Sequence, residues 1–147
     1  MSHKDLSNWL VVSDIDGTLN NKLRKLPKRN FEAIKHFVLK CNGHFTLASG
    51  RNVESMRKHY NRLPIKGTPA VVLNGAGVYD YAQEKMLHFT PINQKAVDLV
   101  FEIYKKFPAL EIEILTDKVI YTLNAKIFAP CMVLADKLHC VNCKSVD

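Results

Sequence analysis

The first half of the chain alternates short apolar runs with segments whose apolar residues recur at helical spacing. Three apolar runs suit strands of a parallel sheet, at residues 9–13, 45–48 and 70–73. Between them, one helix is predicted to open at Pro27 and stop at Asn42-Gly43, and a second to cover residues 53–62. This order predicts an α/β fold in which a parallel sheet has right-handed crossovers and the run 9–13 is buried on both faces.

The pattern changes after about Tyr81. The later segments predict a short strand, an amphipathic helix and a hairpin of two strands, at residues 85–89, 93–107, 111–115 and 119–123. Residues 131–138 are a candidate for one more helix. A domain boundary is therefore expected near residues 79–84, which gives a first domain at 1–82 and a second at 83–147.

Composition and charge narrow the classes of function. The chain has 147 residues, 47% hydrophobic and 24% charged, which is typical of a globular protein. It has no apolar run of 18 residues, so no membrane partner is expected, and residues 1–8 lack the apolar stretch of a secretory signal, so we expect a cytoplasmic protein. The net charge of +7 could indicate nucleic-acid binding, but the basic residues are spread along the chain, so no nucleic-acid partner is expected.

Four cysteines include a CxxC motif at Cys140–Cys143, with Cys131 and His139 nearby. A zinc site would need four converging ligands, whereas only the CxxC has ligand-like spacing. A redox CxxC usually stands at a strand-to-helix turn early in a fold, and this one lies four residues from the end. Chance or surface placement is therefore favoured over metal binding.

The segment with the most informative chemistry is residues 14–19, Asp-Ile-Asp-Gly-Thr-Leu, directly after the first apolar run. Ligands of open α/β sheets bind at the carboxyl ends of strands. Asp14 and Asp16 are two residues apart, so along an extended backbone they face the same side. Gly17 allows a sharp turn, and Thr18 offers a hydroxyl and a backbone N–H beside them.

Two carboxylates placed in this way can share a phosphoryl transfer. One attacks phosphorus to form an aspartyl phosphate, and the other protonates the leaving oxygen and then activates water. A hard cation is needed between carboxylate and phosphate, and Mg²⁺ suits few carboxylates with phosphate oxygens completing its shell. Asp and Gly are also common in turns, but chance should give DxDGT only about once in a thousand chains of this length.

The next two predicted strands also end in polar groups. Ser49-Gly50-Arg51 supplies a hydroxyl, a closely approachable backbone N–H and a guanidinium, which together suit a phosphate cradle. Asn74 follows the third strand and could either contact substrate or brace the neighbouring loops. Three consecutive strands are thus expected to deliver polar groups to one edge of the sheet.

These motifs resemble those of the haloacid-dehalogenase-like hydrolases, and their arrangement looks most like the Cof-type sugar-phosphatase branch. The resemblance implies a Rossmann-like core, present in part as residues 1–82, and part of an α+β cap at 83–147. It implies that Asp14 is the nucleophile and a magnesium ligand, that Asp16 is the acid/base and binds magnesium through its backbone carbonyl, and that Ser49 binds the phosphoryl group. The implied substrates are small phosphorylated metabolites such as sugar phosphates.

The sequence also departs from the family pattern. The family places a lysine and a GDxxND cluster after the cap, and neither is found here. We therefore expect feeble or no turnover from this chain alone, and the alternative is a lapsed member that binds phosphorylated metabolites or a protein. Without the later strands of the sheet, residues 9–13 would keep an open apolar edge, so self-association or pairing with a complementary fragment is expected.

Overall fold

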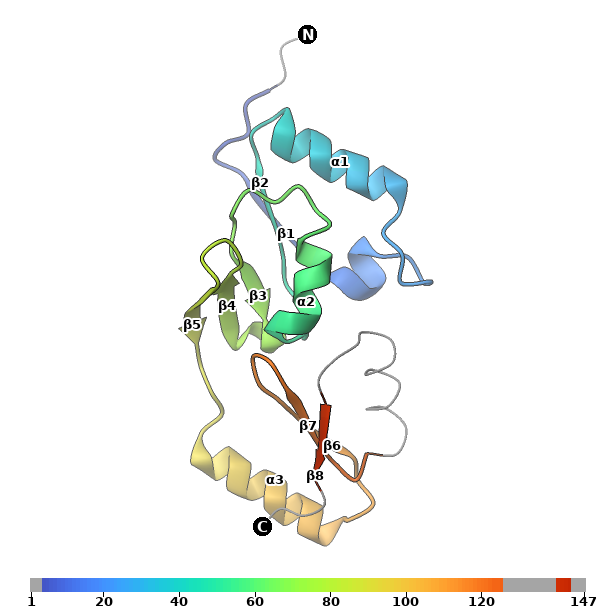
Figure 1. Cartoon of the computed structure of the whole chain (residues 1–147), viewed down its shortest axis with the longest axis vertical. Helices are drawn as coiled ribbons and strands as arrows, with labels where there is room; N and C mark the ends of the chain where they lie inside the picture. Colours follow the sequence, from blue (N-terminus) through green and yellow to red (C-terminus); the bar gives the residue numbers. More distant parts are fainter. Residues whose placement is uncertain (1–3, 126–139, 144–147) are drawn as a thin grey trace. The chain divides into compact units, whose positions relative to one another are not determined.

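The computed structural model describes residues 4–125 and 140–143 (Figure 1). The chain forms two compact units. The first comprises Met1–Arg51 and Met56–Phe89, and the second comprises Asn52–Ser55 and Thr90–Asp147. The assignment of residues 1–82 and 83–147 to a core and a cap stays a prediction.

The first unit is built on parallel strands joined by helices, which confirms the predicted α/β class (Figure 1). Strand β1 (Leu10–Ser13) pairs in parallel with β2 (His44–Leu47), and α1 (Lys28–Leu39) connects them. Helix α2 (Val53–Tyr60) follows β2 and leads toward β3 (Ala70–Val72). The contact between β2 and β3 is a single parallel bridge, Ala48 to Val71.

Beyond the predicted parallel strands, the first unit contains an antiparallel sheet in the order β3-β4-β5. After the short turn η2 (Leu73–Gly75), β4 (Gly77–Asp80) pairs antiparallel with β3, and β5 (Lys85–Phe89) pairs antiparallel with β4. Strand β5 was predicted. Strand β4 was missed because it begins within the glycine-rich turn that ends the third apolar run, and glycine normally indicates a loop.

The core of the first unit is formed by residues of β2, β3, α1 and α2. Leu47 and Met56 are 0% exposed, and Val38 of α1 is 1% exposed. Strand β1 differs, because Leu10 is 57% exposed and Val12 is 48% exposed. The expectation that residues 9–13 are buried on both faces is therefore wrong here. Within the described residues β1 pairs with β2 alone, so its other edge is open.

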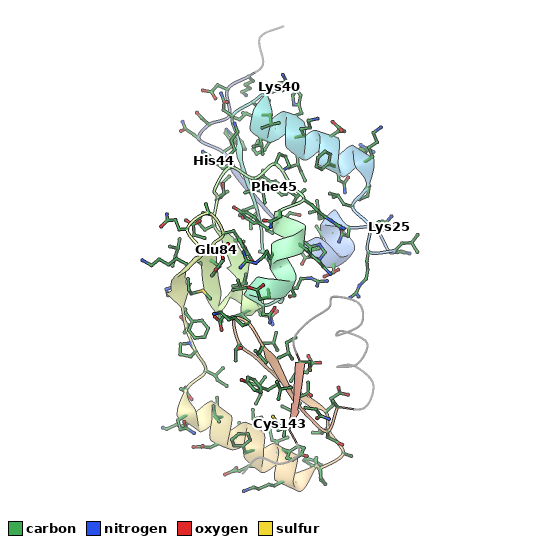
Figure 2. All side chains as sticks on the ribbon, in the orientation of Figure 1. Lys25, Lys40, His44, Phe45, Glu84 and Cys143 are labelled. Carbon is green, nitrogen blue, oxygen red and sulfur yellow. The ribbon has the colours of Figure 1, made fainter. Side chains whose placement is uncertain are left out.

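A polar and aromatic cluster holds the β4–β5 hairpin to α2. The Arg57 guanidinium donates to both carboxylate oxygens of Glu84, at 2.6 and 2.9 Å, and the Tyr79 hydroxyl donates to Oε2 at 2.9 Å. Figure 2 shows Glu84 at this hairpin. The hydrogen bonds from Arg57, followed by that from Tyr79, lower the pKa of Glu84 below its ordinary value. Arg57 also lies over the ring of Tyr81, 5.3 Å from its centroid.

The second unit contains the predicted helix and hairpin. Helix α3 (Gln94–Lys106) is capped by Asn93, whose Oδ1 accepts a hydrogen bond from the Ala96 N–H at 2.9 Å. Strands β6 (Ile112–Leu115) and β7 (Ile120–Leu123) pair antiparallel, which confirms the hairpin. The candidate helix at 131–138 lies outside the described residues.

The CxxC motif lies on β8 (Cys140–Cys143), which pairs in parallel with β7. Residues three apart on a strand point to opposite faces, so the two thiols do not converge as zinc ligands. Cys131 and His139 lie outside the described residues. Within the described part of the chain, no group of three His, Cys, Asp or Glu side chains could hold a metal ion.

None of the helices in residues 4–125 and 140–143 is long and apolar enough to cross a membrane.

Candidate active site

The segment after β1 forms a tight turn, η1 (Ile15–Leu19), at the carboxyl end of the strand. The Leu19 N–H donates to the Asp14 carbonyl at 3.3 Å, and the Asn20 N–H donates to the Ile15 carbonyl at 2.8 Å. Gly17 has φ +86°, a left-handed conformation that glycine adopts without steric cost. The sharp turn that the sequence predicted at Gly17 is therefore present.

Burial alternates along this turn. Ile15 is 1% exposed, whereas its neighbours Asp14 and Asp16 are both exposed, and so is Thr18. Asp14 and Asp16 have extended backbone angles, with ψ of 161° and 112°. The side chain between them is thus directed into the core while the two carboxylates leave on the opposite side.

Asp16 is held by a buried arginine from the next strand's loop. Nε and Nη2 of Arg51 donate to Asp16 Oδ2 at 3.1 and 2.8 Å, and the Arg51 side chain is only 7% exposed. Sequence reasoning placed Arg51 in a phosphate cradle, whereas the structure places its guanidinium on the Asp16 carboxylate. Arg24 was not singled out from the sequence. It lies near the other carboxylate oxygen of Asp16, with its Nε 4.0 Å from Oδ1.

The register of β1 and β2 brings Ser49 to the same edge. Ser13 is paired with Leu47, and the Ala48 N–H donates to the Ser13 carbonyl at 2.9 Å, so Ser49 lies one residue beyond this contact. The half-buried Ser49 accepts a hydrogen bond at Oγ from the Arg51 N–H at 3.4 Å. The Ser49–Arg51 loop is thereby tied to the aspartate turn through Arg51.

Asn74, in the η2 turn after β3, braces this loop. Its N–H donates to the Ser49 carbonyl at 3.3 Å, and the Leu73 N–H donates to the Arg51 carbonyl at 2.9 Å. A Cβ added at Gly50 would lie 2.5 Å from Asn74 Oδ1, so the side-chain amide packs directly against the glycine. Both interpretations of Asn74 were left open by the sequence, and these contacts are of the bracing kind.

Asp14 is the carboxylate that remains available. It is exposed, and within the described residues no hydrogen bond or ion pair engages its side chain, whereas Arg51 and Arg24 flank that of Asp16. Mg²⁺ in phosphate sites takes one or two carboxylates and completes its shell with phosphate oxygens and water. Asp14 and the Asp16 backbone carbonyl are the oxygen donors of this turn that would suit such an ion together with phosphate.

Comparison with known proteins gives the class to which this fold and site belong. The chain belongs to the haloacid dehalogenase-like hydrolase family, whose model matches residues 11–142. The resemblance inferred from the motifs at residues 14–19, 49–51 and 74–76 is therefore confirmed.

Individual relatives agree with this family. The curated protein named "Putative phosphatase MG265", from Mycoplasma genitalium, is 30% identical over 97 residues, which are 66% of this chain and 34% of that protein. A haloacid dehalogenase-like hydrolase from Bacteroides thetaiotaomicron shares the fold with a TM-score of 0.76 at 22% identity, over 93% of this chain and 52% of that one. The HAD subclass IIB sugar phosphatase BT4131 shares the fold with a TM-score of 0.69 at 17% identity, over 91% of this chain and 52% of that one.

The chain therefore spans about a third of the length of the curated relative and about half of the length of these solved structures.

Proposed function

We propose that the chain carries the nucleophile and acid/base of a Mg²⁺-dependent phosphate-monoester hydrolase that acts on small phosphorylated metabolites such as sugar phosphates. The observation that carries this proposal is the contrast between the two carboxylates. Asp14 is exposed and unengaged within the described residues, while Asp16, on the same side of the turn, is oriented by Arg51. This contrast supports a role for Asp14 in the attack and a role for Asp16 at the leaving group.

In the proposed reaction, a carboxylate oxygen of Asp14 attacks phosphorus, and the bond from phosphorus to the ester oxygen breaks. The leaving oxygen takes a proton from the Asp16 carboxyl group, which becomes a carboxylate. That carboxylate then removes a proton from a water molecule, which attacks phosphorus, releases inorganic phosphate and restores Asp14. Mg²⁺, when bound, would offset the repulsion between the Asp14 carboxylate and the phosphate.

The remaining predicted site residues have roles in binding. The Ser49 hydroxyl and the Gly50 N–H are proposed to bind the oxygens of the transferred phosphoryl group, and the Thr18 hydroxyl and N–H to assist from the aspartate turn. Asn74 holds the Ser49–Arg51 loop in place, as its hydrogen bond and its contact with Gly50 indicate. Arg51 acts through Asp16 as a positioning residue.

A phosphate-release assay tests the proposal. The chain is incubated at high concentration with phosphate monoesters, including sugar phosphates, in MgCl₂ or in EDTA. Slow release is expected in MgCl₂ alone, and it should disappear in Asp14→Asn. A charge variant on the far end of α1, Lys40→Met (Figure 2), should leave it unchanged. Equal release by wild type and Asp14→Asn would contradict the proposal.

The rate is expected to be low because the sequence lacks the lysine and the GDxxND cluster of the family pattern. A turnover rate typical of an efficient enzyme, lost in Asp14→Asn, would contradict this part of the proposal. The second candidate function is that of a lapsed member that binds phosphorylated metabolites or a protein partner. Mg²⁺-dependent binding of a sugar phosphate without any phosphate release would support that candidate.

A further inference from the structure

Two arginines flank the Asp16 carboxylate, and they differ in exposure. The Arg51 side chain is 7% exposed, and its Nε and Nη2 both donate to Asp16 Oδ2. The Arg24 side chain is 54% exposed and only approaches Oδ1, with Nε at 4.0 Å. Within the described residues no other polar contact engages its guanidinium. Arg24 therefore has donors left for a second anion, and it presents them beside Asp16.

The loop that carries Arg24 has a defined shape. The side-chain oxygen of Asn21 accepts hydrogen bonds from the N–H groups of Leu23 and Lys25, each at 3.0 Å. The Asn21 N–H donates to the Lys25 carbonyl, and the Arg24 N–H donates to the Asn21 carbonyl, both at 2.9 Å. Arg24 has φ +57°, which is uncommon for a side chain of this size. Four hydrogen bonds to Asn21 hold the backbone in this conformation, so the starting point of the arginine side chain is fixed.

We propose that Arg24 forms an anion subsite for the leaving group, so that the substrate carries a second anionic group, a carboxylate or a second phosphate, close to the ester oxygen. This inference rests on the proposed function. In the proposed reaction Asp16 donates its proton to the leaving oxygen, and Arg24 Nε lies 4.0 Å from Asp16 Oδ1, so Arg24 is assigned to the leaving group. A guanidinium pairs with carboxylate or phosphate through two parallel hydrogen bonds.

The charge around Arg24 supports the same class of substrate. Lys22 and Lys25 lie in the same loop, both are exposed, and Figure 2 shows Lys25 between the η1 turn and α1. Their positive field would favour a ligand with two anionic groups over a ligand with one. With a leaving group that has no anionic group, Arg24 would keep only its ion pair with Asp16. An exposed ion pair at this distance contributes little free energy.

Calorimetric titration with three matched probes in MgCl₂ at low salt tests the subsite. Ethyl phosphate has one anionic group, its phosphate. 2-Phosphoglycolate adds a carboxylate beside the ester, and ethylene glycol bisphosphate adds a second phosphate. We expect at least one of the latter two to bind about tenfold tighter than ethyl phosphate, as hydrogen bonds between charged groups allow. The tighter of the two identifies the preferred anion.

The variants distinguish a specific contact from a general field. The preference is the ratio of the affinity for the tighter probe to the affinity for ethyl phosphate, and in Arg24→Asn it should fall to about one. Asparagine tolerates the left-handed backbone conformation, so the fold is retained. Arg24→Lys should give an intermediate preference, because lysine keeps the charge without the bidentate geometry. Lys40→Met removes a charge elsewhere and should leave the preference unchanged.

The proposal is overturned if the three probes bind wild type equally, or if Arg24→Asn weakens all three by the same factor. Equal, Mg²⁺-dependent binding of all three probes would overturn the subsite and leave the proposed function standing. If none of the probes binds with Mg²⁺, both the subsite and the proposed function are contradicted.

Discussion

The Arg51 guanidinium donates two hydrogen bonds to a single oxygen of Asp16, at 2.8 and 3.1 Å, and thereby links the aspartate turn to the loop that follows β2. The arginine is buried and the aspartate is 38% exposed in its side chain. The Arg51 guanidinium therefore relies on protein acceptors such as Asp16, whereas the Asp16 carboxylate retains contact with solvent. Removing either residue should therefore loosen both loops.

We expect Asp16→Asn to lower the free energy of unfolding by about 1–2 kcal/mol, because the buried guanidinium loses a charged acceptor. Partial exposure of Asp16 keeps this below the cost of breaking a fully buried pair. Urea denaturation of Asp16→Asn, Arg51→Met and the double variant gives the coupling energy. Strict additivity of the two single effects would show that the pair contributes nothing to stability.

Gly50→Ala should destabilise the first unit by about 1–3 kcal/mol, because the new methyl group would lie 2.5 Å from Asn74 Oδ1. Thermal or urea unfolding measures the effect. The double variant Gly50→Ala/Asn74→Ala removes the obstructing amide and should recover part of the lost stability. If the double variant is less stable than the sum of the two single effects predicts, the packing of Asn74 against Gly50 is not the cause.

Stability should fall in acid because of Glu84. Its pKa is lowered in the folded chain by the hydrogen bonds from Arg57 and Tyr79. The stabilisation is therefore fully present above the ordinary glutamate pKa of about 4.3, and it is lost as the pH falls through the lower folded value. The unfolding free energy between pH 7 and pH 3 should be less pH-dependent in Glu84→Gln. The same pH dependence in Glu84→Gln as in wild type would contradict this prediction.

The open edge of β1 should drive association of the chain with a second copy or with a complementary fragment. Trp9, the only tryptophan, is 61% exposed, so its fluorescence should shift to the blue as the protein concentration rises. Val11→Lys should reduce association measured by light scattering, whereas Leu39→Lys, at an exposed apolar position on α1, should not. A stable monomer at high concentration would show that the edge does not associate.

Sequence patterns sufficed for the elements whose signals are local. The position of the aspartate turn followed from a glycine between polar residues after an apolar run, and α3 followed from its apolar stripe. Asp14 and Asp16 were expected on one side because the two-residue period of an extended backbone depends only on sequence spacing. These inferences needed no knowledge of distant contacts.

Other features depend on how separate segments meet. The partnership of Arg51 with Asp16 joins residues 35 positions apart, and an arginine at a strand end is equally suited to a phosphate or to a carboxylate. Arg24 is one of several basic residues between positions 22 and 29, and the sequence does not single it out, since its contact with Asp16 depends on the shape of the loop around Asn21. The open edge of β1 was expected, but the exposure of its side chains was not, because an apolar run indicates a buried strand whatever the number of its neighbours.

Transfer of a phosphoryl group to Asp14 with the help of Mg²⁺ can be tested without turnover. Beryllium trifluoride adds to a nucleophilic carboxylate in place of a phosphoryl group, so ¹⁹F NMR of the chain with beryllium fluoride and MgCl₂ reports the adduct directly. We predict protein-bound fluorine signals in wild type and in Lys40→Met, and their loss in Asp14→Asn. Absence of these signals in wild type, or their persistence in Asp14→Asn, would contradict the account.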